Sequence, residues 1–192
     1  MVKLKKKIII SLMGVDGSGK TTLAKKLHKN IKSSIYLHLK PYILFQDKRT
    51  IIKDPHLQKK SSVILSLLRL MSWLISYKVF FIQNKIKKIY IFDRYAHDVL
   101  IDPLRYKQNL FPVLTKVILN FFPQPDLWIF LNPTIKTIKN RKDELSDSEI
   151  KRQIKEYKKF FSGKKNVLNI NTNGKKIKIV NQITEKINSL IK

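Results

Sequence analysis

A glycine-rich loop near the amino end constrains this chain more than any other stretch. The pattern Gly-x-x-x-x-Gly-Lys-Ser/Thr is filled by Gly14, Gly19, Lys20 and Thr21. An apolar, β-branched run precedes the loop and a helical pattern follows it. Glycine leaves consecutive backbone N–H groups open to anionic oxygens, and a helix that starts there aims its unpaired amides and positive dipole end at the same oxygens. The stretch therefore predicts a site for the phosphates of a nucleotide.

The loop and the first residues of its helix are the expected nucleotide-binding residues: Gly14, Val15, Asp16, Gly17, Ser18, Gly19, Lys20, Thr21 and Thr22. In such a loop the Lys20 ammonium is expected to reach the β- and γ-phosphates, and the Thr21 hydroxyl to ligate Mg²⁺. Asp16 lies inside the loop, and spacing alone leaves two roles open for it. It either acts at the acceptor hydroxyl or the metal, or faces solvent.

A carboxylate and a guanidinium follow a second apolar run. Asp93 and Arg94 come directly after residues 89–92. Ligands of parallel sheets bind at the carboxyl ends of the strands. We therefore expect Asp93 to hold Mg²⁺ or its waters, and Arg94 to bind an acceptor or transferring phosphoryl group through two parallel N–H bonds. The alternative is an ion pair at the strand end between Asp93 and a lysine.

A charged segment without apolar periodicity, at about residues 141–152, is a candidate lid. Its basic residues are Arg141, Lys142, Lys151 and Arg152. The variable positions of the glycine-rich loop hold no arginine. A closing flap would have to supply one to exclude water and neutralise charge on the donor phosphates. The alternative is a solvated helix face.

Apolar runs alternate with helical patterns along the whole chain. The first expected strand is the apolar run that ends at the glycine-rich loop, and the others span 34–39, 89–92, 126–131 and 167–170. The expected helices cover about 20–32, 61–83, a segment from 112, a segment from 132, 150–161 and 180–190. A mainly polar connection is expected at 42–60. Most of these strands are unbroken apolar runs, which is typical of a parallel sheet with helices on both faces. No repeat or linker splits the sequence, so we expect one domain over residues 1–192.

Several local predictions can be compared with side-chain positions. The helix that opens at Pro112 is expected to bury Val113, Leu114, Val117, Ile118 and Phe121. Asn132 is expected to cap the next helix, with Pro133 at its first position. His38 is expected to be a strand side chain near a site and not a metal ligand, because no second histidine or cysteine lies near it in sequence.

The chain of 192 residues is strongly basic, with 40 Lys and Arg against 13 Asp and Glu, a net charge of +27. That charge suggests a nucleic-acid or anionic-membrane partner. The lysines are spread along the chain, however, and a binding tail usually gathers them in blocks, so a lysine-rich composition is the favoured explanation. Cysteine is absent, which excludes a disulfide framework and is typical of a cytoplasmic protein.

Two stretches could suggest a membrane or a signal peptide. Residues 61–83 approach the length of a membrane span, but Arg69 and Lys78 interrupt them. A helix packed within the domain is therefore expected, and a membrane contact remains the weaker alternative. The lysine-rich amino end leads into a short apolar run that passes directly into the glycine-rich loop, so no signal peptide is expected.

Together these residues resemble the thymidylate kinase branch of the P-loop nucleoside-monophosphate kinases, as a divergent member. The resemblance is carried by residues 12–22, by Phe92-Asp93-Arg94-Tyr95, and by the segment from Pro125 through Pro133 to Arg141. It implies a P-loop NTPase fold with a five-stranded parallel sheet in the order 2-3-1-4-5, and ATP and Mg²⁺ as cofactors. It also implies that Asp16 lies near the acceptor sugar, Arg94 on the acceptor phosphate, and lid arginines on the donor.

The sequence departs from the family pattern at three places. Met13 stands where the family usually has glutamate, and residues 38–41 replace an Arg-Glu-Pro-Gly-Gly stretch. Residues 96–98 read Ala-His-Asp, where the family has a serine followed by an Ala-Tyr-Gln run that helps to read thymine. The acceptor is therefore left open by the resemblance.

The leading hypothesis is ATP-dependent phosphoryl transfer to a nucleoside monophosphate, with dTMP, which would become dTDP, as the first candidate. Its expected catalytic residues are Asp16, Lys20, Asp93, Arg94 and Arg141, and its expected metal ligands are Thr21 and Asp93. One alternative is a kinase of a non-nucleotide acceptor such as a sugar or sugar phosphate. Another is a nucleic-acid-associated NTP-binding module, suggested by the net charge of +27. The oligomeric state, including a homodimer, is left open.

Overall fold

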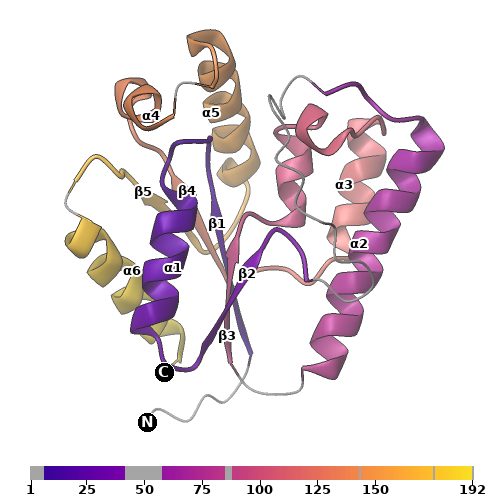
Figure 1. Cartoon of the computed structure of the whole chain (residues 1–192). Coiled ribbons are helices and arrows are strands. Elements are labelled where there is room, and N and C mark those ends of the chain that lie inside the picture. Colours follow the sequence, from indigo (N-terminus) through magenta and orange to yellow (C-terminus); the bar gives the residue numbers. More distant parts are fainter. Residues whose placement is uncertain (1–6, 42–57, 85–87, 143, 175, 192) are drawn as a thin grey trace. The chain divides into compact units, whose positions relative to one another are not determined.

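In the computed structural model the chain divides into two units (Figure 1). Residues 1–38, 86–95 and 125–192 form the first unit, and residues 39–85 and 96–124 form the second. The structure describes residues 7–41, 58–84, 88–142, 144–174 and 176–191. Most of the connection predicted at 42–60 lies outside the described residues, as do the basic amino end and residue 143 of the proposed lid. One domain over 1–192 with a lid stays a prediction.

A parallel sheet of five strands forms the centre of the first unit. The strands are β1 (Ile8–Met13), β2 (Ser34–His38), β3 (Ile89–Asp93), β4 (Leu127–Leu131) and β5 (Val167–Ile170). Their order is β2-β3-β1-β4-β5, and each neighbouring pair is parallel. The α/β fold and the sheet order that the sequence predicted are therefore confirmed.

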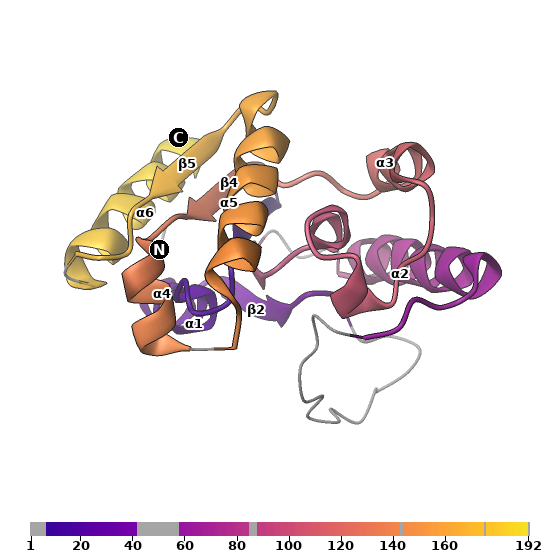
Figure 2. The same ribbon diagram turned by 90° about the horizontal axis from the view of Figure 1, so that it is seen from above.

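The two faces of the sheet bury different side chains, because successive residues of a strand point to opposite faces. One face is aliphatic, and α1 (Lys20–Asn30) and α6 (Lys176–Ile191) pack on it through Leu27 and Ile183, both fully buried. The other face is aromatic, and Phe130 of β4 lies against Tyr157 of α5 (Asp147–Ser162) with ring centroids 5.6 Å apart. Figure 2 shows the sheet between α6 and α5. The three central strands are buried on both faces, which explains their unbroken apolar runs.

The helix after β4 begins later than predicted. α4 spans Ile135–Arg141, and its N-cap is Thr134, whose side chain accepts a hydrogen bond from the Thr137 N–H. The prediction of Asn132 as the cap is wrong because the Asn132 N–H donates to the carbonyl of Ile170, 2.8 Å away. That bond extends the β4–β5 ladder by one residue, so the chain can turn into a helix only beyond it.

The second unit contains α2 (Val63–Gln83), the 3₁₀ helices η2 (Ala96–Leu100) and η3 (Leu104–Tyr106), and α3 (Pro112–Asn120). α3 buries Thr115, Ile118 and Leu119. The inward face predicted for this helix is correct only at Ile118; the exposed members are Val113, Leu114, Val117 and Phe121. α3 is apolar on more than one side, so the pattern did not select a face. Thr115 can be buried because its hydroxyl donates to the Phe111 carbonyl.

α2 is confirmed as a long helix with one packed face. Trp73 and Tyr77 are buried on it and make edge-to-face contacts with Tyr106 and Phe122. Within the described residues α2 is the one helix whose length and apolar composition would suffice to cross a membrane, and 33% of that window is buried. Large exposed apolar side chains gather on this helix and on α3: Val63, Ile64, Leu65, Leu67, Leu68, Met71, Ile75, Ile82, Val113, Leu114 and Val117.

Replacement of Ile183 by alanine tests the aliphatic side of the sheet. Ile183 is fully buried on α6, so Ile183→Ala removes buried methyl groups and leaves a cavity. We expect the free energy of unfolding in guanidinium to fall by about 2–5 kcal/mol. Ile177→Ala on the same helix is the matched control, because Ile177 is 73% exposed, and its effect should stay within about 0.5 kcal/mol. Equal effects of the two variants would contradict this packing.

Candidate active site

The glycine-rich loop runs from the carboxyl end of β1 to the first residue of α1. Gly17 and Gly19 have φ values of 82° and 94°, which L-residues with side chains rarely adopt. A Cβ on Gly17 would also lie 2.8 Å from the Ile138 carbonyl oxygen. Gly19 is the N-cap of α1 and has no side chain, so the amides that open the helix stay accessible from the loop. The backbone conformation is the one the sequence pattern requires for a phosphate site.

A cavity of about 390 Å³ opens over this loop. Its wall contains Asp16, Gly17, Ser18, Gly19, Lys20, Thr21, Thr22, Leu23, Lys26, Arg94, Arg141, Lys142, Thr172, Lys176 and Ile179. Three of the side chains that the sequence singled out from distant segments, Asp16, Arg94 and Arg141, therefore share one cavity. Six of its residues are cationic, which suits an anionic ligand.

Asp16 is buried among cations and does not face solvent. The Arg94 Nη2 contacts its Oδ1, and the Lys20 Nζ lies 3.5 Å from the same oxygen. The Lys142 Nζ lies 4.0 Å from its Oδ2. Spacing alone left open whether the Asp16 side chain faces solvent or the site; in the structure it faces the cavity. The aspartate links the loop to β3 through Arg94 and to the end of α4 through Lys142.

The Lys20 side chain lies inside the loop. Its ammonium donates to the carbonyl oxygens of Gly14 and Val15, at 2.7 and 2.8 Å, and is 5% exposed. Tyr157 of α5 donates its hydroxyl to the same Gly14 carbonyl at 3.1 Å. Contact between Lys20 and a phosphate would require the ammonium to turn away from these carbonyls.

Asp93 is fully buried at the end of β3 and receives its partners on one oxygen. Oδ2 accepts hydrogen bonds from Thr21 at 2.7 Å and Tyr36 at 3.0 Å, and lies 3.2 Å from the His38 Nδ1. Oδ1 is buried without a hydrogen-bond partner among the described residues. The partners of Oδ2 are thus two hydroxyls and an imidazole. The alternative prediction, an ion pair at the strand end between Asp93 and a lysine, would have placed an ammonium there.

The environment of Asp93 favours its ionised form. Burial alone would raise the pKa of this carboxyl, but the hydrogen bonds from His38 and Thr21 and the charges of His38 and Lys20 outweigh it, so the pKa lies below the ordinary aspartate value. This carboxylate has one oxygen bonded to the Thr21 hydroxyl and the other without a partner among the described residues. Such an arrangement fits Mg²⁺, which usually takes one or two protein ligands and completes its shell with phosphates and water. A protein cage of three or more His, Asp or Glu is not present among the described residues.

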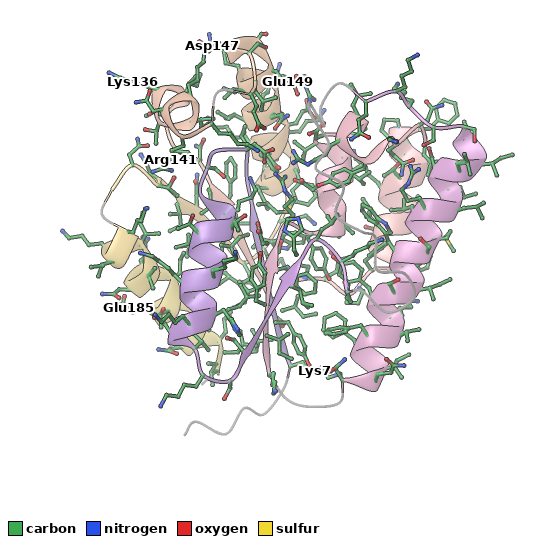
Figure 3. The ribbon with its side chains drawn as sticks, in the orientation of Figure 1. Lys7, Lys136, Arg141, Asp147, Glu149 and Glu185 are labelled. Carbon is green, nitrogen blue, oxygen red and sulfur yellow. The ribbon has the colours of Figure 1, made fainter. Side chains whose placement is uncertain are left out.

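The segment predicted as a lid contributes two of its four cations to the cavity. Arg141 is the last residue of α4, and Lys142 follows it; both line the cavity (Figure 3 labels Arg141). Lys151 and Arg152 lie on the exposed side of α5, where Arg152 forms a bidentate pair with Glu149. Neither is among the cavity residues, so of these four cations Arg141 and Lys142 are the two at the cavity, and closure of the segment as a lid stays a prediction.

Three residues that hold the site by hydrogen bonds, Thr172, Tyr36 and Tyr157, were not selected as site residues from the sequence. Thr172 accepts from Arg141 and donates to the Ser18 carbonyl at 3.0 Å. Its position two residues after β5, at a strand's carboxyl end, could have indicated it. No sequence feature indicated a role in the site for Tyr36 or Tyr157, because a tyrosine within a predicted strand or on the apolar face of a predicted helix is interpreted as a core residue.

Comparison with known proteins agrees with this architecture. The family model described as thymidylate kinase matches residues 12–191. The chain belongs to the thymidylate kinase family. Its members are P-loop kinases of nucleoside monophosphates, so the resemblance read from the loop and the Asp93-Arg94 pair is confirmed, and the enzyme class with it. A search of curated protein sequences finds no match.

Solved structures match over almost the whole chain. The thymidylate kinase from Candida albicans is 19% identical, with a TM-score of 0.60 over 96% of this chain and 92% of its own. The deoxyadenosine kinase from M. mycoides with bound dCTP is 17% identical, with a TM-score of 0.63 over 95% and 100%. The thymidylate kinase from Ehrlichia chaffeensis is 17% identical, with a TM-score of 0.61 over 96% and 99%. At these identities the likeness shows the fold.

Replacement of Gly17 by alanine tests the loop geometry. The new Cβ would meet the Ile138 carbonyl in a backbone conformation that alanine rarely adopts. We expect Gly17→Ala to lower the free energy of unfolding by about 1–3 kcal/mol and to weaken nucleotide binding. Gly163→Ala, at the end of α5, is the control because no atom lies within 4 Å of its added Cβ. A Gly17→Ala protein as stable as the control would show that the loop has another conformation.

The depressed pKa of Asp93 predicts the sign of an acid effect. A carboxyl whose pKa is lowered on folding stabilises the folded state fully above its unfolded pKa, and this contribution is lost as the pH falls through the folded pKa. The free energy of unfolding of wild type should therefore fall more steeply below about pH 4 than that of Asp93→Asn. Parallel acid slopes in urea titrations of the two proteins would contradict the assignment.

Proposed function

We propose that this kinase transfers the γ-phosphoryl group of ATP to dTMP, with Mg²⁺ as its metal. In that reaction an oxygen of the dTMP phosphate forms a bond to the γ-phosphorus, the bond from that phosphorus to the β–γ bridging oxygen breaks, and dTDP and ADP leave. The observation that carries the proposal is the cavity in which the glycine-rich loop, Arg94 and Arg141 meet.

The donor phosphates are assigned to the loop and the start of α1. Residues 14–22 present backbone N–H groups from a loop whose glycines admit a close approach. Lys20 would exchange the carbonyls of Gly14 and Val15 for phosphate oxygens, which are stronger acceptors for an ammonium because they carry charge. The side chain already lies within the loop, so the exchange begins from a position inside the proposed phosphate site.

Mg²⁺ is assigned to Thr21 and Asp93. Support comes from the buried Asp93 Oδ1, which has no hydrogen-bond partner among the described residues, and from the Thr21 hydroxyl 2.7 Å from Oδ2. The chemistry that the metal supplies when bound is neutralisation of charge on the β- and γ-phosphate oxygens. Tyr36 and His38 hold the carboxylate by its other oxygen, so its orientation does not depend on the metal.

Arg94 and Asp16 are assigned to the acceptor. A guanidinium can hold two phosphate oxygens at once and is always charged. Asp16 contacts Arg94 and limits its rotation, and we assign its carboxylate as the hydrogen-bond acceptor for the acceptor sugar. Positioning and charge neutralisation of this kind supply most of the catalysis in phosphoryl transfer.

Arg141 is assigned to the donor, from the segment predicted as a lid. It supplies a cation at the cavity, and residues 15–18 of the loop contain none.

We further propose that the enzyme acts in the cytoplasm in nucleotide biosynthesis, supported by the absence of cysteine and by the family. Support for dTMP as the acceptor comes from the family model. It does not come from residues 96–98, because they do not match the residues with which the family usually reads thymine.

A panel of acceptors tests the function. ADP release should be followed in a coupled assay with Mg-ATP and dTMP, dUMP, dCMP, dAMP or dGMP, with thymidine and a sugar phosphate as further acceptors. We expect the highest kcat/KM with dTMP. Highest turnover with another monophosphate would overturn the choice of base, and no ADP release with any monophosphate would overturn the kinase assignment itself.

Replacement of Arg94 tests the acceptor site. Arg94→Ala should lower kcat/KM for the monophosphate by about 10²-fold or more, because a cation aimed at a phosphoryl group is lost. Arg94→Lys should recover part of the loss, since it keeps the charge but not the two parallel donors. Arg152→Ala is the matched control, because Arg152 lies outside the cavity and pairs with Glu149. Equal kinetics of Arg94→Ala and this control would remove Arg94 from the mechanism.

A further inference from the structure

Thr172 joins three segments of the first unit that are far apart in sequence. It follows β5, and its side chain is 6% exposed. Its hydroxyl donates to the Ser18 carbonyl of the glycine-rich loop at 3.0 Å. The Arg141 Nη1 donates to the same hydroxyl at 3.1 Å, and the Arg141 Nη2 donates to the Thr172 carbonyl at 2.8 Å. One threonine thus contacts both the loop and the arginine at the end of α4.

The direction of these hydrogen bonds leaves Thr172 one arrangement. A hydroxyl has one proton and two lone pairs. The Ser18 carbonyl is an acceptor only, so it must take the proton, and the guanidinium is a donor only, so it must use a lone pair. A hydroxyl is the one group of this size that can serve both neighbours, and a methyl group in its place can serve neither.

The same contacts fix where the guanidinium lies. The Arg141 Nη1 is 3.6 Å from the position of a Cβ on Gly19, which places it beside the last glycine of the loop. Arg141 is otherwise exposed, and a free arginine side chain loses rotamer entropy when it binds a ligand. Thr172 takes up two of its five N–H donors and leaves the rest for a ligand in the cavity that Arg141 lines.

From this we infer that Thr172 is a positioning residue, which holds the Arg141 guanidinium over the phosphate loop before ATP binds. The inference rests on the proposed function, in which Arg141 contacts the donor. Thr172 itself need not touch the nucleotide. It lowers the entropic cost of engaging Arg141, and it couples the position of the arginine to the loop through Ser18.

The test compares Thr172→Val with Thr172→Ser in steady-state kinetics with Mg-ATP and the preferred monophosphate. Valine keeps the shape and loses the hydroxyl, so kcat/KM for ATP should fall about tenfold, the usual cost of a lost hydrogen bond to a charged group. Serine keeps the hydroxyl and should stay within about twofold of wild type. Thr184→Val is the matched control, since its hydroxyl donates to the Val180 carbonyl on α6, outside the cavity.

A double-mutant cycle separates this role from a structural one. Thr172→Val should have no further effect on kcat/KM in an Arg141→Ala background, because the arginine through which Thr172 acts is already gone. Thermal unfolding of all variants shows whether a loss of activity is a loss of folded protein, and activities are compared below the lowest midpoint. An equal effect of Thr172→Val with and without Arg141, or an inactive Thr172→Ser, overturns the inference.

Failure of the proposed function looks different in the same experiment. If Arg141→Ala leaves kcat/KM for ATP unchanged, the donor role of Arg141 is wrong, and with it the premise of the inference. If Arg141→Ala lowers kcat/KM while Thr172→Val matches the Thr184→Val control, the donor role stands and Thr172 does not position the arginine.

Discussion

The register of three parallel strands is the constraint on which the site depends. Leu12 of β1 and His38 of β2 both pair with Asp93 of β3, so these strands end at one level. The glycine-rich loop leaves β1 one residue later, and the first helical turn that follows carries Thr21 to within 2.7 Å of Asp93. A shift of β3 by one residue would turn Asp93 to the other face of the sheet and separate it from this hydroxyl. The same hydrophobic pattern that buries the central strands therefore aligns the side chains to which we assign the metal.

The backbone at Arg94 is the second consequence of that register. Its N–H donates to the Leu12 carbonyl at 3.0 Å, which continues the ladder one residue past β3. Its φ of 71° lies in the left-handed region, unusual for a residue with a long side chain. Such conformations persist where the surroundings impose them and cluster at functional sites. Here the turn directs a buried guanidinium to Asp16, and this ion pair limits the positions that the cation can take.

The parts of the site that the sequence predicted are those in which residue type and spacing are both required by the chemistry. The loop from Gly14 to Thr22 and the carboxylate at the end of β3 belong to this class. The sheet order was predicted by the family resemblance and not by spacing. Thr172 and Tyr157 were not predicted, because a hydroxyl that bonds to a distant carbonyl leaves no pattern along the chain. The buried face of α3 was mispredicted for a different reason: a helix that is apolar on several sides has no unique stripe, and the polar Thr115 lies on the buried one.

The most direct test of the account is a crystal structure of the enzyme with Mg-ADP and dTMP bound. The account predicts the ADP phosphates in the loop, the metal within ligand distance of the Thr21 hydroxyl and on or one water away from the Asp93 Oδ1, and the dTMP phosphate on the Arg94 guanidinium. Phosphates bound away from residues 14–22, or a metal held by neither Thr21 nor Asp93, would contradict it.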